Sequence, residues 1–181
     1  MVIAIGATAQ EYKKFKVGIG LGYAAAGGDG AKGGILAYLE PAYRINDAIA
    51  IGLRIESALI TRGFSDELAD DVNLSMAAIG SYTVNGQYYF NMNRFRPFVG
   101  AGFGLYTLAA VDVEFGGNSA TALEAGTKFG FYPRVGFDYG HLNVSVDYNI
   151  ISKSEIAGGV GSFKNNYLGI RLGFSIGGGK N

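Results

Sequence analysis

Few residues of this chain could carry nucleophilic chemistry. The 181 residues include one His, His141, and no Cys, so thiolate nucleophiles and thiolate zinc sites are excluded. A hydrolase or acyltransferase would need a nucleophile such as Ser beside a His that a carboxylate holds. Ser145 would lie roughly 13 Å from His141 along a strand, at about 3.3 Å per residue. We therefore expect no catalytic site and interpret His141 as a turn residue.

Two further segments fall short of a binding site. Residues 65–71 carry four acidic side chains that could supply oxygen ligands to calcium, but their spacing matches no EF-hand loop. The Gly-rich segments 27–30 and 100–104 resemble phosphate loops and precede no predicted helix. The sequence thus predicts a solvated acidic loop, no metal and no cofactor.

Charged residues also recur at alternating positions within apolar stretches. In residues 15–23 the odd positions carry Phe, Val, Ile, Leu and Tyr, whereas the even positions carry Lys16 and three Gly. Such alternation is typical of β-strands with two different faces. The face opposite the large apolar side chains carries ten charged residues: Lys16, Arg44, Arg54, Lys128, Arg134, Arg171, Glu40, Glu56, Asp138 and Asp147.

Eight stretches with this period predict eight strands. They cover residues 15–23, 35–44, 49–56, 76–90, 99–105, 128–139, 142–149 and 168–176. The connections are long around 24–34, 61–75, 112–126 and 152–164, and short near 45–48, 91–95 and 140–141. This alternation is typical of an up-and-down antiparallel barrel with both termini at the short-turn end.

Side-chain volume indicates which face points outward. The apolar face carries about forty large side chains, whereas the interior of an eight-stranded barrel is only just wide enough for side chains to fill. We therefore expect the apolar face outside, against lipid, rather than inside as in a soluble lipocalin-like barrel. Lipid requires a closed sheet because an open edge leaves backbone groups unpaired. The predicted fold is all-β: an eight-stranded antiparallel up-and-down transmembrane β-barrel with four long extracellular loops and short periplasmic turns.

The inward charges are expected to pair. If the intervening short turns close as hairpins, Glu40 lies opposite Arg54 and Arg134 lies opposite Asp147, while Arg171 should also reach Asp147. Because an isolated buried charge costs several kcal/mol, we expect a compensated network that plugs the lumen. A small pore gated by re-pairing of these charges is the alternative, and a lipid-modifying enzyme is less favoured.

Aromatic residues near the strand ends predict girdles at the two membrane interfaces. These residues are Tyr23, Tyr43, Tyr88, Phe90, Tyr139 and Phe174.

The composition agrees with a barrel of this kind. Thirty residues are Gly and only 17% are charged, as expected for a narrow lumen and an outer face against lipid. The 15 basic and 15 acidic residues balance, so no nucleic-acid partner is expected. Residues 1–9 are small and apolar and end in an A-x-A pattern, which predicts a residual signal peptide before a single domain at 10–181. A short apolar first strand is the alternative.

Two strand segments resemble recurring strand sequences of the small eight-stranded outer-membrane barrels. They are RPFVGAGFG at 96–104 and FYPRVGFDY at 131–139. That family includes the OmpA-like transmembrane domain and the OmpX group, and the resemblance covers nearly all of residues 13–176. It implies a place in the outer membrane of Gram-negative bacteria and insertion by the barrel assembly machinery. We also expect a monomer among outer-membrane lipid and lipopolysaccharide, with both termini periplasmic. The resemblance also implies a non-enzymatic role in envelope integrity, adhesion or contact with an unidentified extracellular ligand.

Overall fold

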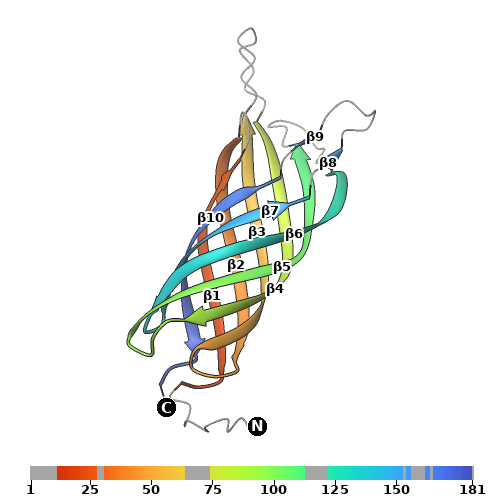
Figure 1. Ribbon diagram of the computed structural model, residues 1–181. Coiled ribbons are helices and arrows are strands. Elements are labelled where there is room, and N and C mark those ends of the chain that lie inside the picture. Colours follow the sequence, from red (N-terminus) through yellow and green to blue (C-terminus); the bar gives the residue numbers. More distant parts are fainter. Residues whose placement is uncertain are drawn as a thin grey trace, which may run out of the picture.

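The period-two alternation of the sequence is realised as eight barrel strands in the computed structural model (Figure 1). The structure describes residues 12–27, 31–63, 74–112, 122–152, 154–155, 162–163 and 165–180. The barrel strands are β1 (Phe15–Ala26), β2 (Ala31–Arg44), β3 (Ile49–Gly63), β4 (Leu74–Tyr89), β5 (Phe95–Asp112), β6 (Ala122–Tyr139), β7 (Leu142–Ile151) and β10 (Tyr167–Gly177). Within the described ranges, no helix is long and apolar enough to cross a membrane.

The strands pair antiparallel around a closed ring. Their order is β1-β10-β7-β6-β5-β4-β3-β2, and β2 pairs with β1 again. The closing ladder between β1 and β10 runs from the Lys16–Gly177 pair to the Ala26–Tyr167 pair. Every barrel strand therefore has two hydrogen-bonded neighbours, and the predicted eight-stranded fold is confirmed.

The large apolar side chains point outward, as the volume argument predicts. Along β10, buried and exposed residues alternate: Arg171 is 1% exposed, whereas its neighbours Ile170 and Leu172 are 47% and 58% exposed. Because successive side chains of a strand point to opposite faces, one parity of each strand fills the lumen. The other parity forms an apolar outer belt.

Two of the predicted connections differ from the structure. β1 continues to Ala26 and β2 begins at Ala31, so the predicted long connection at 24–34 is wrong and residues 27–30 alone join the strands. The extra strand positions are mostly Ala and Gly, which carry almost no hydrophobic periodicity. The connection after β7 contains a small antiparallel pair, β8 (Ser154–Glu155) and β9 (Ser162–Phe163), which the sequence pattern did not predict.

The interior near the longer connections is apolar. Leu36, Ile60, Ile79 and Ile151 are at most 3% exposed and pack in one cluster with small Ala side chains and three Tyr rings. These residues lie toward the ends of β2, β3, β4 and β7 that face those connections. The sequence pattern predicts an inward face of mainly small and charged residues, and this apolar layer corrects that interpretation.

The opposite end is closed by both terminal segments. Gly177 and Gly178 have φ values of 75° and 64°, a left-handed conformation that Gly adopts without steric cost, and they turn the chain beyond β10. The Lys13 amide then donates to the Gly179 carbonyl at 2.9 Å, and Tyr12 forms a β-bridge with Lys180. The start of β1 and the end of β10 lie together at the lower end of the barrel in Figure 1.

Candidate functional site

The barrel interior holds a dense set of buried charges. Nine of the ten predicted inward charges are buried, and Lys128, the tenth, is half-buried. No ion pair of the described side chains includes Lys128. Sequence reasoning missed two buried charges, Arg96 and Asp47. Arg96 has the parity of the inward residues of β5 and could have been found by extending the alternation three residues upstream.

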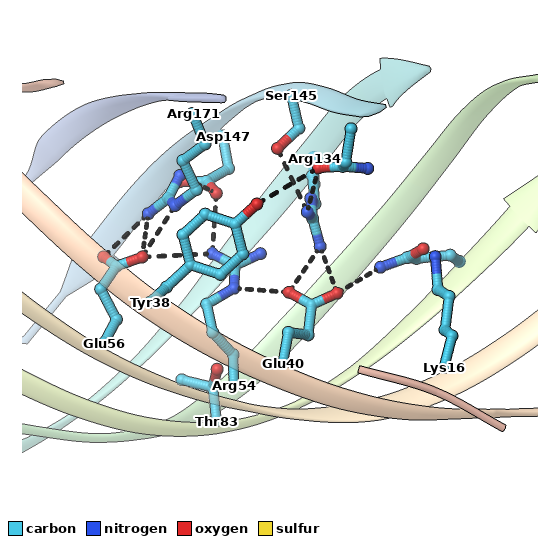
Figure 2. Close-up of polar contacts among 12 residues, drawn as sticks. Lys16, Tyr38, Glu40, Arg54, Glu56, Thr83, Arg134, Ser145, Asp147 and Arg171 are labelled. Atoms are coloured by element: carbon cyan, nitrogen blue, oxygen red, sulfur yellow. Dashed lines mark hydrogen bonds and ion pairs between the residues drawn. The ribbon is translucent and has the colours of Figure 1, made fainter. Parts of the chain in front are cut away.

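Glu40 on β2 is the acceptor at one side of the lumen. Arg54 Nε donates to its Oε2 at 3.0 Å, and Arg134 Nη1 lies 2.8 Å from both carboxylate oxygens. Gln87 Nε2 adds a hydrogen bond of 2.7 Å to Oε1. Two arginines from different strands thus share one carboxylate (Figure 2).

A second group of charges lies beside the first. Arg171 donates from Nε to Glu56 Oε2 at 2.7 Å and also pairs with Asp147. Arg54 Nη1 lies 2.8 Å from Asp147 Oδ2 and 3.8 Å from Glu56 Oε2. Arg54 therefore joins the two groups (Figure 2). We call the resulting set the central network: Glu40, Arg54, Glu56, Arg134, Asp147 and Arg171.

The central network crosses the full width of the barrel. Glu40 on β2 and Arg134 on β6 are four strands apart in either direction around the eight-stranded ring. The same holds for Arg54 on β3 and Asp147 on β7. Both ion pairs therefore join opposite walls. The three arginines and three carboxylates also balance in charge.

One predicted ion pair is wrong although its register is right. Arg134 and Asp147 are direct partners across the β6–β7 ladder, as expected. However, Arg134 reaches across the lumen to Glu40 and also donates to Ser145 at 3.1 Å, while Asp147 pairs with Arg54 and Arg171. The register fixes neighbours within the sheet, whereas these long side chains find partners across the ring. The expected contacts of Glu40 with Arg54 and of Asp147 with Arg171 are present.

A lysine pair extends the polar interior toward the short turns. Lys16 Nζ lies 3.3 Å from Asp138 Oδ2 and donates to the Tyr89 hydroxyl at 2.7 Å. The Tyr89 hydroxyl is 2.9 Å from both Asp138 Oδ2 and Gln87 Oε1. Since Gln87 also contacts Glu40, this pair is connected to the central network.

Buried aromatic rings fill the space around the charges, and four of them lie against a Gly of a neighbouring strand: Tyr38, Phe98, Tyr106 and Tyr132. Tyr132 is the register partner of Gly102, and an added Cβ at Gly102 would collide with the Tyr132 ring. Tyr38 lies over its partner Gly20 in the same way, with 2.7 Å to the position of an added Cβ. Sequence reasoning missed six inward rings, although they share the parity of the inward charges: Tyr38, Tyr89, Phe98, Tyr106, Tyr132 and Tyr167.

A cluster of Tyr12, Arg44, Tyr89 and Arg96, which we call the terminal cluster, closes the short-turn end. The Arg96 guanidinium carbon lies 3.9 Å from the Tyr12 ring centroid and 4.2 Å from that of Tyr89. The Arg44 guanidinium carbon lies 4.8 Å from the Tyr12 centroid. Cation–π contacts of this kind strengthen when they are desolvated, and all four residues of the terminal cluster are buried.

His141 and Ser145 have separate partners. The His141 ring contacts the Ser175 carbonyl at 2.8 Å through Nδ1 and stacks on Phe174 at the short-turn end. The Ser145 hydroxyl is buried and accepts from Arg134. The two side chains thus make no nucleophile–base pair. In the part of the chain that the structure describes, no group of His, Cys, Asp or Glu could hold a metal ion.

All six predicted girdle residues lie on the outer face and are exposed. Five of them lie at the short-turn end, and Tyr23 lies toward the other end of β1. The six residues thus gather mainly at one end of the barrel rather than at both ends. The acidic segment 65–71 and the predicted signal peptide at 1–9 lie outside the described residues.

Comparisons with known proteins agree on one family and one fold. A family model described as outer membrane protein beta-barrel domain matches residues 1–175. Among solved structures, Neisserial surface protein A is similar at a TM-score of 0.58 with 18% identity, covering 92% of this chain and 98% of that one. The outer membrane protein OprG from Pseudomonas aeruginosa is similar at 0.53 with 14% identity, covering 93% and 98%. No curated protein sequence matches the chain.

Proposed function

We propose a function from one premise: the chain belongs to the outer membrane protein beta-barrel domain family, and its place is the outer membrane. In this proposal it is a non-enzymatic barrel whose lumen is plugged by side chains. It serves envelope structure or contacts at the cell surface through its outer loops. The name of Neisserial surface protein A is compatible with a surface role.

The observation that carries the proposal is that ion pairs join opposite walls of the lumen. The Glu40–Arg134 and Arg54–Asp147 pairs each cross from a strand to the one four positions away around the ring. Their side chains are at most 5% exposed. An ion moving along the barrel would have to separate these pairs, and leaving one partner of a buried pair uncompensated costs about 3–5 kcal/mol.

Two further layers support a closed lumen. Toward the longer connections, the aliphatic side chains of Leu36, Ile60 and Ile79 offer no hydrogen-bonding groups to replace the hydration shell of an ion. Toward the short turns, the terminal cluster packs rings against guanidinium groups. The proposal therefore rests on three successive barriers along the barrel axis.

The remaining parts of the proposal concern orientation and partners. The short turns and both termini face the periplasm, and the longer connections face outward, where they bind an extracellular ligand that is still to be identified. The apolar outer belt contacts outer-membrane lipid, with lipopolysaccharide around the outer half, after insertion by the barrel assembly machinery. The barrel acts as a monomer.

Planar-bilayer recording tests the closed lumen. The folded chain, identified by a band shift of the unheated sample on an SDS gel, should produce no steady conductance when it is inserted into the bilayer. A general porin inserted in the same bilayer serves as the positive control for recording. Steady, large conductance from the folded barrel would overturn the proposal.

A small gated pore is the second candidate, and one feature favours it. Arg54 contacts Glu40, Glu56 and Asp147 at once, so it could exchange partners without being left uncompensated. In that case the recordings should show brief stepwise openings, and their frequency should change in Arg54→Lys. Absence of any openings in recordings of both the wild type and Arg54→Lys argues against this candidate.

A further inference from the structure

A hollow of about 260 Å³ opens at the short-turn end of the barrel. We call it the terminal hollow. It is lined by the turn between β6 and β7, the residue Arg94 of the turn between β4 and β5, and the segment after β10, together with Arg44 and Arg96 from the strands. Since about 10–15 Å³ of such space admits one water, the hollow can hold a small molecule with its hydration water.

The lining of the terminal hollow is strongly basic. Arg44, Arg94, Arg96 and Lys180 contribute cations, whereas Asp138 is its one acidic residue. Asp138 is already engaged by Lys16 and accepts from Asn143 at 2.6 Å. The hollow therefore carries a surplus of positive charge.

None of the three arginines forms an ion pair with an acidic side chain in the described ranges. Arg44 donates from Nη1 to the Gly178 carbonyl at 2.7 Å, and Arg96 donates from Nη2 to the Asp47 carbonyl. Both arginines are at most 3% exposed, and Arg44 Nε and Arg96 Nη1 are buried without a hydrogen-bond partner. The central network balances each of its arginines with a carboxylate, and these two lack that balance.

We propose that the terminal hollow binds a phosphate-type oxyanion. Arginines from three separate elements line it, and guanidinium forks match phosphate oxygens well. A phosphate group would supply negative charge to the arginines that line the hollow. Several acceptor oxygens on one compact anion suit donors that approach from the strands, from a turn and from the terminal segment.

The position of the hollow allows two sources of phosphate. Arg94 lies beside the exposed ring of Tyr139, with 5.0 Å from its guanidinium carbon to the ring centroid, and His141 stacks on the exposed Phe174. The rim is therefore at the level of the aromatic girdle, where phospholipid headgroups lie. The bound group is either the phosphate of a headgroup or a free phosphate from the aqueous side.

The test uses the full folded chain in zwitterionic detergent micelles at constant ionic strength. Titration calorimetry with inorganic phosphate measures the free-anion arm. Native mass spectrometry after incubation with phosphatidylglycerol measures how many phospholipids stay bound. We expect saturable binding in at least one arm, and the arm that responds identifies the source.

Matched variants locate the site. Losing one charge-assisted hydrogen bond to the anion should weaken binding about tenfold in Arg96→Gln and at least about threefold in Arg94→Gln. Lys14→Gln removes the same charge from an exposed residue near this end that does not line the hollow, and its affinity should stay within about twofold of the wild type. If Arg96→Gln fails to fold, the exposed Arg94→Gln carries the test. Absence of binding in both arms, or equal binding in Arg94→Gln and the wild type, would overturn the proposal.

Discussion

Removing one carboxylate from the central network should destabilise the barrel strongly. Glu40→Gln keeps the size of the side chain but leaves three arginines with two carboxylates. Glu40 accepts from Arg54, Arg134 and Gln87 at 2.7–3.0 Å and is 4% exposed. Water has little access to the charge left uncompensated because Arg54 and Arg134 are at most 2% exposed.

The magnitude follows from leaving a buried charge uncompensated. Breaking one partner of a buried ion pair costs about 3–5 kcal/mol, and Gln retains one acceptor oxygen, so we expect about 3 kcal/mol for Glu40→Gln. Arg134→Gln should cost a similar amount because Glu40 is its one ion-pair partner among the described residues. The double variant restores charge balance. It should therefore cost about 2–3 kcal/mol less than the sum of the two single variants.

Equilibrium unfolding in urea measures these free energies. The chain contains no Trp, so the folded fraction is followed by gel mobility of unheated samples and by circular dichroism. Lys14→Gln, an exposed charge change, is the control and should stay within about 0.5 kcal/mol of the wild type. Losses below about 1 kcal/mol in both single variants, or strict additivity in the double variant, would refute a mutually compensating network.

Two further variants test the packing around the charges. Gly102→Val should lower the free energy of unfolding by about 1–3 kcal/mol because the new side chain pushes against the Tyr132 ring. Gly80→Val should be nearly neutral because an added Cβ there meets no atom within 4 Å. Equal urea midpoints for the two variants would contradict the packing of the Tyr132 ring on Gly102. Tyr12→Ala should cost about 3–5 kcal/mol, since the ring is 7% exposed and stacks against two arginines of the terminal cluster. An unchanged unfolding curve for this variant would show that the terminal cluster does not close the barrel.

The architecture could be derived from the sequence because it depends on a repeated local signal. Alternation in β10, where Leu172 and Phe174 flank Gly173, sets which side chains face lipid. The turn at 140–141 sets the register, and the Arg134–Asp147 pairing in the β6–β7 ladder follows from it. The signal was lost where both faces carry small residues. For that reason, the sequence pattern assigns the paired strand positions Ala24 and Gly34 to a loop.

The inward rings were missed for a different reason. A strand whose outer face carries Ile35 and Leu39 also carries Tyr38 on its inner face, and composition alone assigns all three to the apolar set. The Gly opposite some of these rings is the informative feature. Tyr38 with Gly20 and Tyr132 with Gly102 are register partners, so a large inward residue can be recognised from an inward Gly beside it.

Some ion pairs of the central network depend on closure of the barrel. The register between adjacent strands does not by itself predict them. Register placed Asp147 beside Arg134, yet each of these side chains forms an ion pair with a residue on the opposite wall. In a ring of eight strands, inward side chains on strands four positions apart face each other. Within the central network, two ion pairs follow this rule: Glu40 with Arg134 and Arg54 with Asp147. The pairs of Glu40 with Arg54 and of Asp147 with Arg171 join neighbouring strands instead. The strand count therefore contains the missing information. Register thus accounts for the ion pairs between neighbouring strands, and closure of the barrel adds the pairs that cross the lumen.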